Sequence, residues 1–385
     1  MTADLVASAA SIIPDIRAAR AETDEARRLP DAVVSKLVEA GMFRQALPSE
    51  LGGDELAPPT ALSLYEELAR AEASVAWLVW NSALPCLFSR FLDSETRAEI
   101  FGDPSSKYAS STRPSGRATL ENGHYRLRGR WSLVSGCLHA DWLGFMHMVE
   151  EDGEIQMLEP GAPNMRLAFV PSDACEILDT WHVGGLRGTG SHDVVLEDVV
   201  VPVARSFSPM DESRVDRPIG RIPIAATMAA GHAAICLGVA QAALDAVIEL
   251  AHSKVTVDPV PDLRDRSVNQ ITVARAGVKL PALRGELRAA LDRLWELARE
   301  DHAPTADDIA HVWGTAVTTA RECRDLVTEL CDVGGSSSLY TDCVLERCHR
   351  DIQGALQHIV VQRMWLEEAG RVKLGMEPTH PLFWL

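Results

Sequence analysis

The spacing of apolar residues changes twice along the chain, and this order limits the folds open to it. Up to about residue 104 apolar residues recur at helical intervals, as in Thr60–Phe91. From about 105 to 215 they alternate with polar residues, as in Tyr125–Val134, which follows the hairpin signal Asn122-Gly123. The sequence therefore predicts an N-terminal helical domain over 1–104, a central β domain over 105–215 and a C-terminal helical bundle over 216–385.

Long stretches of helical periodicity fill the C-terminal third. The stretch Ile222–Ala251 is alanine-rich and apolar on most faces, which predicts burial on several sides. Further helices are expected over 268–299, 305–330 and 340–370, and Pro281 is expected to kink or split the first of these. Such helices are typical of a four-helix bundle, and their extra apolar surface favours assembly with other copies of the chain.

Charge and cysteine usage argue against several classes of protein. The chain has 385 residues and a formal net charge of −18, which argues against binding to nucleic acid or to an anionic membrane. No apolar run is expected to span a bilayer, and the first residues lack a signal-peptide pattern, so we expect a cytoplasmic protein. The eight cysteines form no Cys-x-x-Cys pair and no histidines show metal-ligand spacing, so we expect free thiols and no metal site.

A glycine-rich segment at 181–196 runs into an alternating apolar strand. Four glycines accompany Arg187, Thr189 and Ser191 there. Glycine lets a backbone approach a ligand closely, and hydroxyl and guanidinium groups supply hydrogen-bond donors. The pattern fits a loop shaped around a flat polar ligand or a phosphate, and it fits equally well a tight turn without a ligand.

Five stretches in order resemble the acyl-CoA dehydrogenase superfamily, and the similarity covers nearly the whole chain. They are Leu29–Gly53, Glu66–Trp77, Trp131–Gly136, Leu186–Val194 and Val333–Asp351. The resemblance implies a mostly α fold with a central β domain: N-terminal helices, a middle β-barrel-like domain and a C-terminal four-helix bundle. It also implies a homotetramer.

Within these stretches the details are similar to the flavin-dependent monooxygenase branch of the superfamily. The run Trp131–Trp142 and the segment Ser111–Ala118 resemble the aromatic and phenol hydroxylases of that branch. Dehydrogenases of the superfamily carry a glutamate shortly after an Arg-Asp pair, whereas here Arg350-Asp351 is followed by His358 with no carboxylate between. Oxidation of an acyl thioester needs a carboxylate base, while imidazole titrates near neutral pH and suits hydroxylation of a phenol or indole.

The resemblance also implies roles for particular residues. His358 would be the catalytic base or the protonation partner of a flavin C4a-hydroperoxide, and Ser135 would place a hydroxyl beside the reacting edge of the flavin; purely structural roles stay open for both. Asn81 and His139 would contact substrate, although packing is the stronger interpretation of His139. The implied cofactor contacts are Leu133, Val134, Ser135, Arg187, Thr189, Gly190, Ser191, Arg264, Gln270, Gly334, Gly335 and Ser336.

On this resemblance the chain is expected to be the oxygenase component of a two-component flavin monooxygenase. A separate NAD(P)H-dependent reductase would supply reduced FAD or FMN, because the sequence shows no Gly-x-Gly-x-x-Gly nicotinamide fingerprint. The other reactants would be O2 and a small aromatic molecule, phenolic or indole-like. Two alternatives remain: an acyl-CoA dehydrogenase or oxidase with a relocated base, and a catalytically inactive scaffold.

Overall fold

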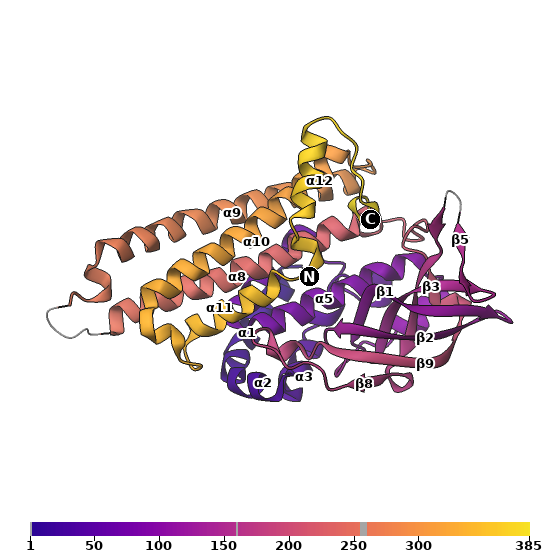
Figure 1. The fold of residues 1–385 in the computed structure, drawn as a ribbon, viewed down its shortest axis with the longest axis horizontal. Coiled ribbons are helices and arrows are strands. Elements are labelled where there is room, and N and C mark those ends of the chain that lie inside the picture. The colour runs from indigo at the N-terminus through magenta and orange to yellow at the C-terminus, as the bar shows by residue number, and fades with distance from the viewer. Residues whose placement is uncertain (1, 159–160, 255–259) are drawn as a thin grey trace.

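Helices enclose one side of a twisted sheet in the computed structural model, which describes residues 2–158, 161–254 and 260–385 (Figure 1). The predicted helical run Thr60–Phe91 is divided, because Glu72 adopts an extended conformation and its carboxylate accepts a hydrogen bond from the backbone N–H of Ser74 at 3.3 Å. The N-terminal helices are α1 (Thr2–Ala18), α2 (Arg20–Ala26), α3 (Asp31–Glu39), α4 (Pro58–Ala71), α5 (Ala73–Phe88) and α6 (Ser94–Phe101).

The central sheet has the strand order β10-β7-β3-β1-β2-β9-β8, with β4 added beside β3. Strands β1 and β3 are parallel, and the other neighbours are antiparallel. The turn at Asn122-Gly123 is confirmed: both residues have positive φ, 49° and 79°, and they join β1 to β2. The strands are β1 (Tyr108–Glu121), β2 (His124–Val134), β3 (Trp142–Glu151), β4 (Glu154–Ile155), β7 (Met165–Pro171), β8 (Glu176–Leu178), β9 (His192–Pro202) and β10 (Ser206–Phe207), with β5 (Met157–Leu158) and β6 (Ala162–Pro163) forming a separate pair.

Three irregularities interrupt the ladders of the sheet. Between β1 and β3 the register shifts after Ser111, and between β2 and β9 it shifts between Leu127 and Gly129 and again between Trp131 and Val134. Leu133, inside the last of these shifts, has a φ of 61°, which a leucine rarely adopts. Bulges of this kind re-aim side chains and occur often beside functional sites.

The C-terminal helices differ from expectation in two places. The helix α9 runs without interruption over Ser267–Arg299 with Pro281 inside it, so Pro281 does not split it. The single helix expected over 340–370 is wrong, because three shorter elements replace it: α11 (Val344–Ala355), η9 (Ile359–Val361) and α12 (Met364–Lys373). The remaining helices are α7 (Pro218–Arg221), α8 (Ile224–Ser253) and α10 (Ala306–Gly334).

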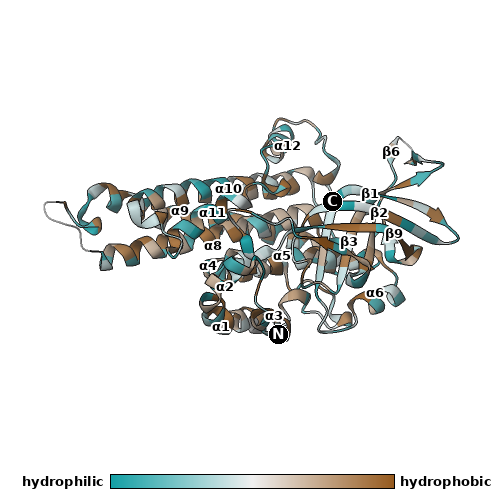
Figure 2. Cartoon of the chain, turned by 60° about the horizontal axis from the view of Figure 1, so that its bottom comes forward, coloured by the Kyte–Doolittle hydropathy of each residue, from teal (hydrophilic) through white to brown (hydrophobic). Residues whose placement is uncertain are grey.

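Helix α8 forms the centre of the bundle, and Figure 2 colours much of it as hydrophobic. It is long and apolar enough to cross a membrane by length and composition, so the expectation that no run reaches this length was too strict. In the folded chain 67% of its most apolar 18-residue window is buried, as in a core helix. A second, smaller core lies within the sheet around the fully buried Trp131.

Candidate active site

Four rings from three parts of the chain meet between the helices and the sheet. Trp77 and Trp80 come from α5, His232 from α8, and His358 from the segment after α11. The centroid of the His358 ring lies 5.5 Å from Trp77, 5.2 Å from Trp80 and 5.5 Å from His232, with the two imidazoles stacked at 29°. The tryptophans meet the histidines edge to face. We call these four residues the aromatic box.

His358 lies in the short non-helical segment between α11 and η9. Its Nδ1 accepts a hydrogen bond from the backbone N–H of Val360 at 3.4 Å, which caps η9. Removal from water, with a smaller effect of the Arg113 charge, lowers the pKa of His358 to about 4. The ring is therefore neutral at physiological pH, and with Nδ1 acting as an acceptor its proton is assigned to Nε2. This tautomer offers a hydrogen-bond donor to a ligand.

Sequence reasoning missed His232. Its side chain is fully buried, its Nδ1 lies 3.8 Å from Cys236 Sγ, and its Nε2 has no hydrogen-bond partner in the described part of the chain. Burial, with a smaller contribution from His358, lowers the pKa of His232 well below its usual value. A signal was available, because His232 is the only ionisable nitrogen side chain in the apolar stretch Ile224–Ala240.

A chain of hydrogen bonds leads from the aromatic box into the glycine-rich segment. Trp77 Nε1 donates to Ser135 Oγ at 3.0 Å, Ser135 and Ser191 share a 2.7 Å contact, and so do Ser191 and Thr189. Thr189 donates to the carbonyl of Leu186 at 2.8 Å. Because the Thr189 proton is committed to that carbonyl, Ser191 must donate to Thr189 and Ser135 to Ser191. The Ser135 hydroxyl oxygen therefore keeps a lone pair that can accept a hydrogen bond from a ligand. To donate a hydrogen bond to a ligand, Ser135 would need the donor direction to reverse along the whole chain of hydroxyls.

Asn81 and Leu133 support this end of β2. The Asn81 amide donates to the carbonyl of Ser135 at 3.3 Å, so a residue expected to touch substrate holds the backbone of the site. Leu133, at its positive φ, leaves 48% of its side chain exposed, while Val134 is fully buried. The bulge thus exposes Leu133 beside Ser135 and anchors the strand through Val134.

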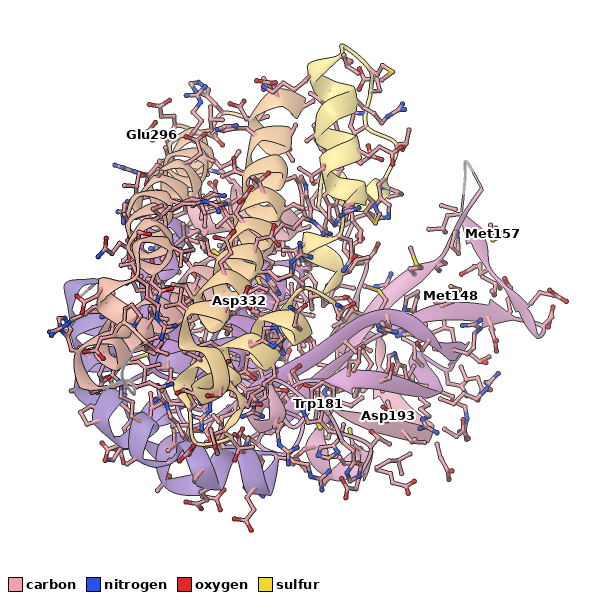
Figure 3. The ribbon with its side chains drawn as sticks, turned by 60° about the vertical axis from the view of Figure 1, so that its left-hand side comes forward. Met148, Met157, Trp181, Asp193, Glu296 and Asp332 are labelled. Atoms are coloured by element: carbon pink, nitrogen blue, oxygen red, sulfur yellow. The ribbon has the colours of Figure 1, made fainter. Side chains whose placement is uncertain are left out.

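The glycine-rich loop is clamped against α11. The backbone N–H of Leu186 donates to Asp351 Oδ1 at 2.6 Å, and Arg350 Nη1 donates to the Gly184 carbonyl at 3.1 Å. A Cβ on Gly185 would lie 2.1 Å from the Arg350 carbonyl oxygen, so only glycine fits there. Burial, helped by the nearby Glu72, raises the pKa of Asp351 to about 7. Figure 3, which labels Trp181, shows the start of this loop at the edge where the sheet meets the helices.

The other residues of this loop that were predicted to contact the cofactor, Arg187 and Gly190, contact other parts of the chain. Arg187 Nε donates to the carbonyl of Asp24 at 2.9 Å, and its Nη1 donates to the carbonyl of Val183 at 3.2 Å. Gly190 has a φ of 50° and packs against the backbone of Arg27. A cofactor contact by Arg187 stays a prediction. In the structure the Arg187 side chain fixes the loop to α2.

His139 lies in the turn after β2, where its backbone N–H donates to the Gly136 carbonyl at 3.0 Å. The charges that act on its ring belong to Arg28, Asp31 and Lys107, and burial is the main reason why its pKa falls to about 4. Its Nε2 has no partner among the described residues. None of the aromatic-box residues contributes to this environment, so the structure gives no support to a substrate contact by His139.

The residues expected to hold the distal part of a flavin lie at the far end of the bundle. Gly334 packs against Leu250, which lies eighteen residues after His232 on α8, a separation of about 27 Å along a helix. Gly335 and Ser336 continue from there into a 3₁₀ turn. Arg264 and Gln270 are exposed at the start of α9, where the Gln270 amide donates to the Arg264 carbonyl. One chain therefore does not bring these residues to its own aromatic box.

The residues near the box fit a flavin ring system. A flavin presents flat aromatic faces and a polar edge. The box supplies stacked and edge-on rings, the bulge at Leu133 presents an apolar face, and Ser135 supplies an oxygen between them. Buried groups without partners in the described chain, Ser110 Oγ and His232 Nε2, provide unused hydrogen-bonding capacity. No described carboxylate acts on His358, so the base that a thioester dehydrogenase needs has no counterpart at this position.

A helical–β–helical fold with a carboxylate-free, histidine-containing site defines a flavin-dependent oxygenase on an acyl-CoA dehydrogenase framework. The models of the acyl-CoA dehydrogenase N-terminal and C-terminal domains match residues 7–101 and 230–363. An indole-3-acetate monooxygenase from Pseudomonas putida is 30% identical over 94% of this chain and 91% of its own length. The oxygenase component of an FADH2-dependent resorcinol hydroxylase from a Rhizobium species is 28% identical over 97% and 95%.

Solved structures agree with these relatives. XiaF from a Streptomyces species, in complex with FADH2 and glycerol, superposes with a TM-score of 0.90 at 27% identity, covering 99% of this chain and 97% of its own. The chain belongs to the acyl-CoA dehydrogenase-like family of flavin-dependent monooxygenases. It is the oxygenase component of a two-component system that uses reduced FAD or FMN and works with a separate flavin reductase.

Proposed function

We propose that this oxygenase hydroxylates an electron-rich aromatic ring of phenolic or indole type, with His358 as a neutral hydrogen-bond donor. The observation that carries this proposal is the aromatic box, in which His358 is neutral and its Nδ1 is engaged by Val360. Relatives named for indole-3-acetate and resorcinol support an aromatic substrate.

The protein groups around the substrate have distinct tasks in this proposal. When bound, reduced flavin supplies the electrons that activate O2. The rings of Trp77 and Trp80 exclude water and hold a flat substrate, and His358 Nε2–H donates to an oxygen that gains negative charge during the reaction. The engaged Nδ1 favours this donor role over that of a general base. The chain Trp77–Ser135–Ser191 keeps the site in one geometry.

The test compares wild type with two variants at His358. Protein, reduced FMN or FAD, O2 and indole or a phenol are mixed, and hydroxylated product and H2O2 are both quantified. His358→Phe keeps a ring in the box but removes the donor, so product should fall at least about tenfold while H2O2 rises. His358→Gln keeps an N–H donor and should recover part of the coupling.

The same experiment separates the proposal from its alternatives. Equal product yields in all three proteins would remove His358 from the mechanism. Bleaching of tightly bound FAD by an acyl-CoA, with no hydroxylated product, would instead support a dehydrogenase with a relocated base. Failure to bind reduced flavin in either form would support a scaffold.

We also propose a homotetrameric, cytoplasmic protein in which neighbouring subunits complete the cofactor site. Support comes from α9, where the apolar residues Val268, Ile271 and Val278 are 64%, 67% and 74% exposed. Exposed apolar residues close together on one helix favour a contact with another subunit. The distance between the Gly334 region and the aromatic box of the same chain also favours a contribution from a neighbour. Light scattering should give the mass of four chains, and Val278→Glu should reduce it.

A further inference from the structure

A small cavity adjoins the aromatic box, and Trp80 belongs to both. The Trp80 ring lies 5.2 Å from the His358 ring and 5.4 Å from the His232 ring, and it also lines the cavity. On α8, Gly231 lines the cavity while the next residue, His232, belongs to the box. A Cβ on Gly231 would lie 2.7 Å from Trp80 Cδ1, so α8 lies directly against this ring. The Trp80 indole is therefore a wall shared by the box and the cavity, which we call the Trp80 cavity.

The size of the Trp80 cavity limits what it can hold. Its volume is about 20 Å³. A space of this size holds a molecule as small as water or O2, whereas an indole or a flavin ring does not fit. The wall is formed largely by apolar residues from helices α4, α5, α7 and α8, among them Leu62, Ala83, Ile219 and Met228.

The few polar side chains on this wall are already hydrogen-bonded to protein. Gln45 Nε2 donates to Tyr65 Oη at 2.7 Å, and Trp80 Nε1 donates to the Met228 carbonyl at 3.0 Å. Thr227 donates to the carbonyl four residues before it at 2.6 Å. Among the described residues of the wall, no buried side-chain nitrogen or oxygen lacks a partner. A bound water needs about two to four polar partners, whereas dry apolar cavities take up apolar molecules such as xenon.

A second cavity of about 10 Å³ adjoins the first. The two share Ala46, Leu87 and Ile219 as wall residues. The one charged residue among the described residues that line the second cavity is Arg90, which is buried and donates to three backbone carbonyls within 219–222. The two cavities together form a path of low polarity that leads to Trp80.

We infer that the Trp80 cavity binds O2 and supplies it to the reaction at the aromatic box. This inference rests on the proposed function, because it gives the gaseous co-substrate a place beside the same site. A monooxygenase must bring O2 to reduced flavin while water is kept out of the site. O2 is small, neutral and apolar, so it fits a wall that lacks the free hydrogen-bonding groups needed to retain water. Transfer to the box then requires a displacement of the Trp80 ring.

The test measures the reaction of bound reduced flavin with O2. Oxygenase in excess over reduced FMN or FAD is mixed in a stopped-flow instrument with buffers of increasing O2 concentration. The slope of the observed rate constant against O2 concentration is the second-order rate constant. Ala83→Val fills the Trp80 cavity, and Ala46→Val narrows the passage between the two cavities.

Ala243→Val is the matched control. Ala243 is also a buried alanine, and it lies about 17 Å beyond His232 along α8. It is not among the described residues that line either cavity. Its valine variant therefore adds the same bulk to the core at a distance from the proposed O2 site.

Ala83→Val and Ala46→Val should lower the second-order rate constant at least about fivefold, because displacing an inserted methyl group in a packed core has a cost that corresponds to this factor or more. Ala243→Val should stay within about twofold of wild type. The dissociation constants of reduced flavin and of indole should change by less than about twofold in all three variants. In crystals pressurised with xenon, wild type should hold xenon beside Trp80, and Ala83→Val should not.

The inference is wrong if both Ala83→Val and Ala46→Val react with O2 as fast as wild type, or if ordered water occupies the cavity in place of xenon. Weaker binding of indole with an unchanged rate constant would assign the cavity to the substrate instead. Failure of the proposed function is distinguishable, because O2 oxidises bound reduced flavin and yields H2O2 even when no aromatic ring is hydroxylated.

Discussion

Removing the Ser135 hydroxyl tests whether the hydrogen-bond chain from Trp77 to Leu186 stabilises the site. In Ser135→Ala, Trp77 Nε1–H loses its acceptor at 3.0 Å and Ser191 loses its donor at 2.7 Å. Both partners are buried, at 7% and 4% exposure, so water cannot replace the lost bonds without rearrangement. An unsatisfied buried group costs about 1–3 kcal/mol, and two of them predict a loss of about 2–6 kcal/mol of unfolding free energy.

A double-mutant cycle isolates the Trp77–Ser135 bond from the volume lost in each variant. Unfolding free energies from urea titration at one fixed protein concentration are compared for wild type, Trp77→Phe, Ser135→Ala and the double variant. The predicted coupling is about 1–2 kcal/mol. Ser132→Ala is the control on the same strand, because Ser132 makes no hydrogen bond through its side chain to any described residue, and it should stay within about 0.5 kcal/mol of wild type.

The reasoning fails if the coupling between Trp77 and Ser135 is below about 0.3 kcal/mol, the range in which distant residues are simply additive. A loss in Ser135→Ala no larger than that in Ser132→Ala would contradict it as well. Either result would mean that the hydroxyl chain does not hold the end of β2 in place.

Three further predictions concern the loop, the buried acid and the histidines. Gly185→Ala should lower the unfolding free energy and reduce coupled turnover, because its Cβ would lie 2.1 Å from a backbone oxygen. Gly184→Ala is the control: a Cβ there meets open space, so both quantities should match those of wild type. Asp351 has a pKa of about 7 when folded and 3.8 as its usual value, so the folded state binds the extra proton and stability should fall as pH rises between these values. Asp351→Asn should flatten that part of the urea-derived stability profile. The pKa values of His358 and His147 lie near 4 against a usual 6.5, so the unfolded chain binds more protons and stability should fall as pH drops from 6.5 to 4; His147→Gln should reduce this slope.

Local patterns were sufficient for much of the fold. The Asn122-Gly123 turn was predictable because few other dipeptides accept two positive φ values, and the burial of α8 followed from its apolar residues on every face. The mostly α fold with a central β domain is confirmed by the family matches and by the superposition on XiaF.

The break around His358 could not be read from the sequence, because apolar residues continue at helical spacing through it. Side-chain hydrogen bonds to backbone carbonyls six residues earlier replace the helical ladder there. The Gln362 amide donates to the Leu356 carbonyl at 2.9 Å, and Trp365 Nε1 donates to the Ile359 carbonyl at 2.7 Å. These contacts stabilise the turn that places His358 in the aromatic box.

The partners of His358 were equally hidden. His232 lies on another helix far away in sequence, and its meaning emerges only when the two imidazoles stack. The sequence could not show either that Arg187 donates to the backbone carbonyl of Asp24, and its predicted cofactor contact stays a prediction. Sequence patterns predicted individual site residues, and long-range packing decides which side chains face one another.

Isotope labelling tests the central claim most directly. Wild-type protein loaded with reduced flavin is exposed to ¹⁸O₂ in the presence of indole-3-acetate or a simple phenol, and the products are weighed by mass spectrometry. The account predicts one ¹⁸O atom in the hydroxylated aromatic product, with H2O2 as a minor product. Label found only in H2O2 across both substrates, with the aromatic compounds recovered unchanged, would contradict it.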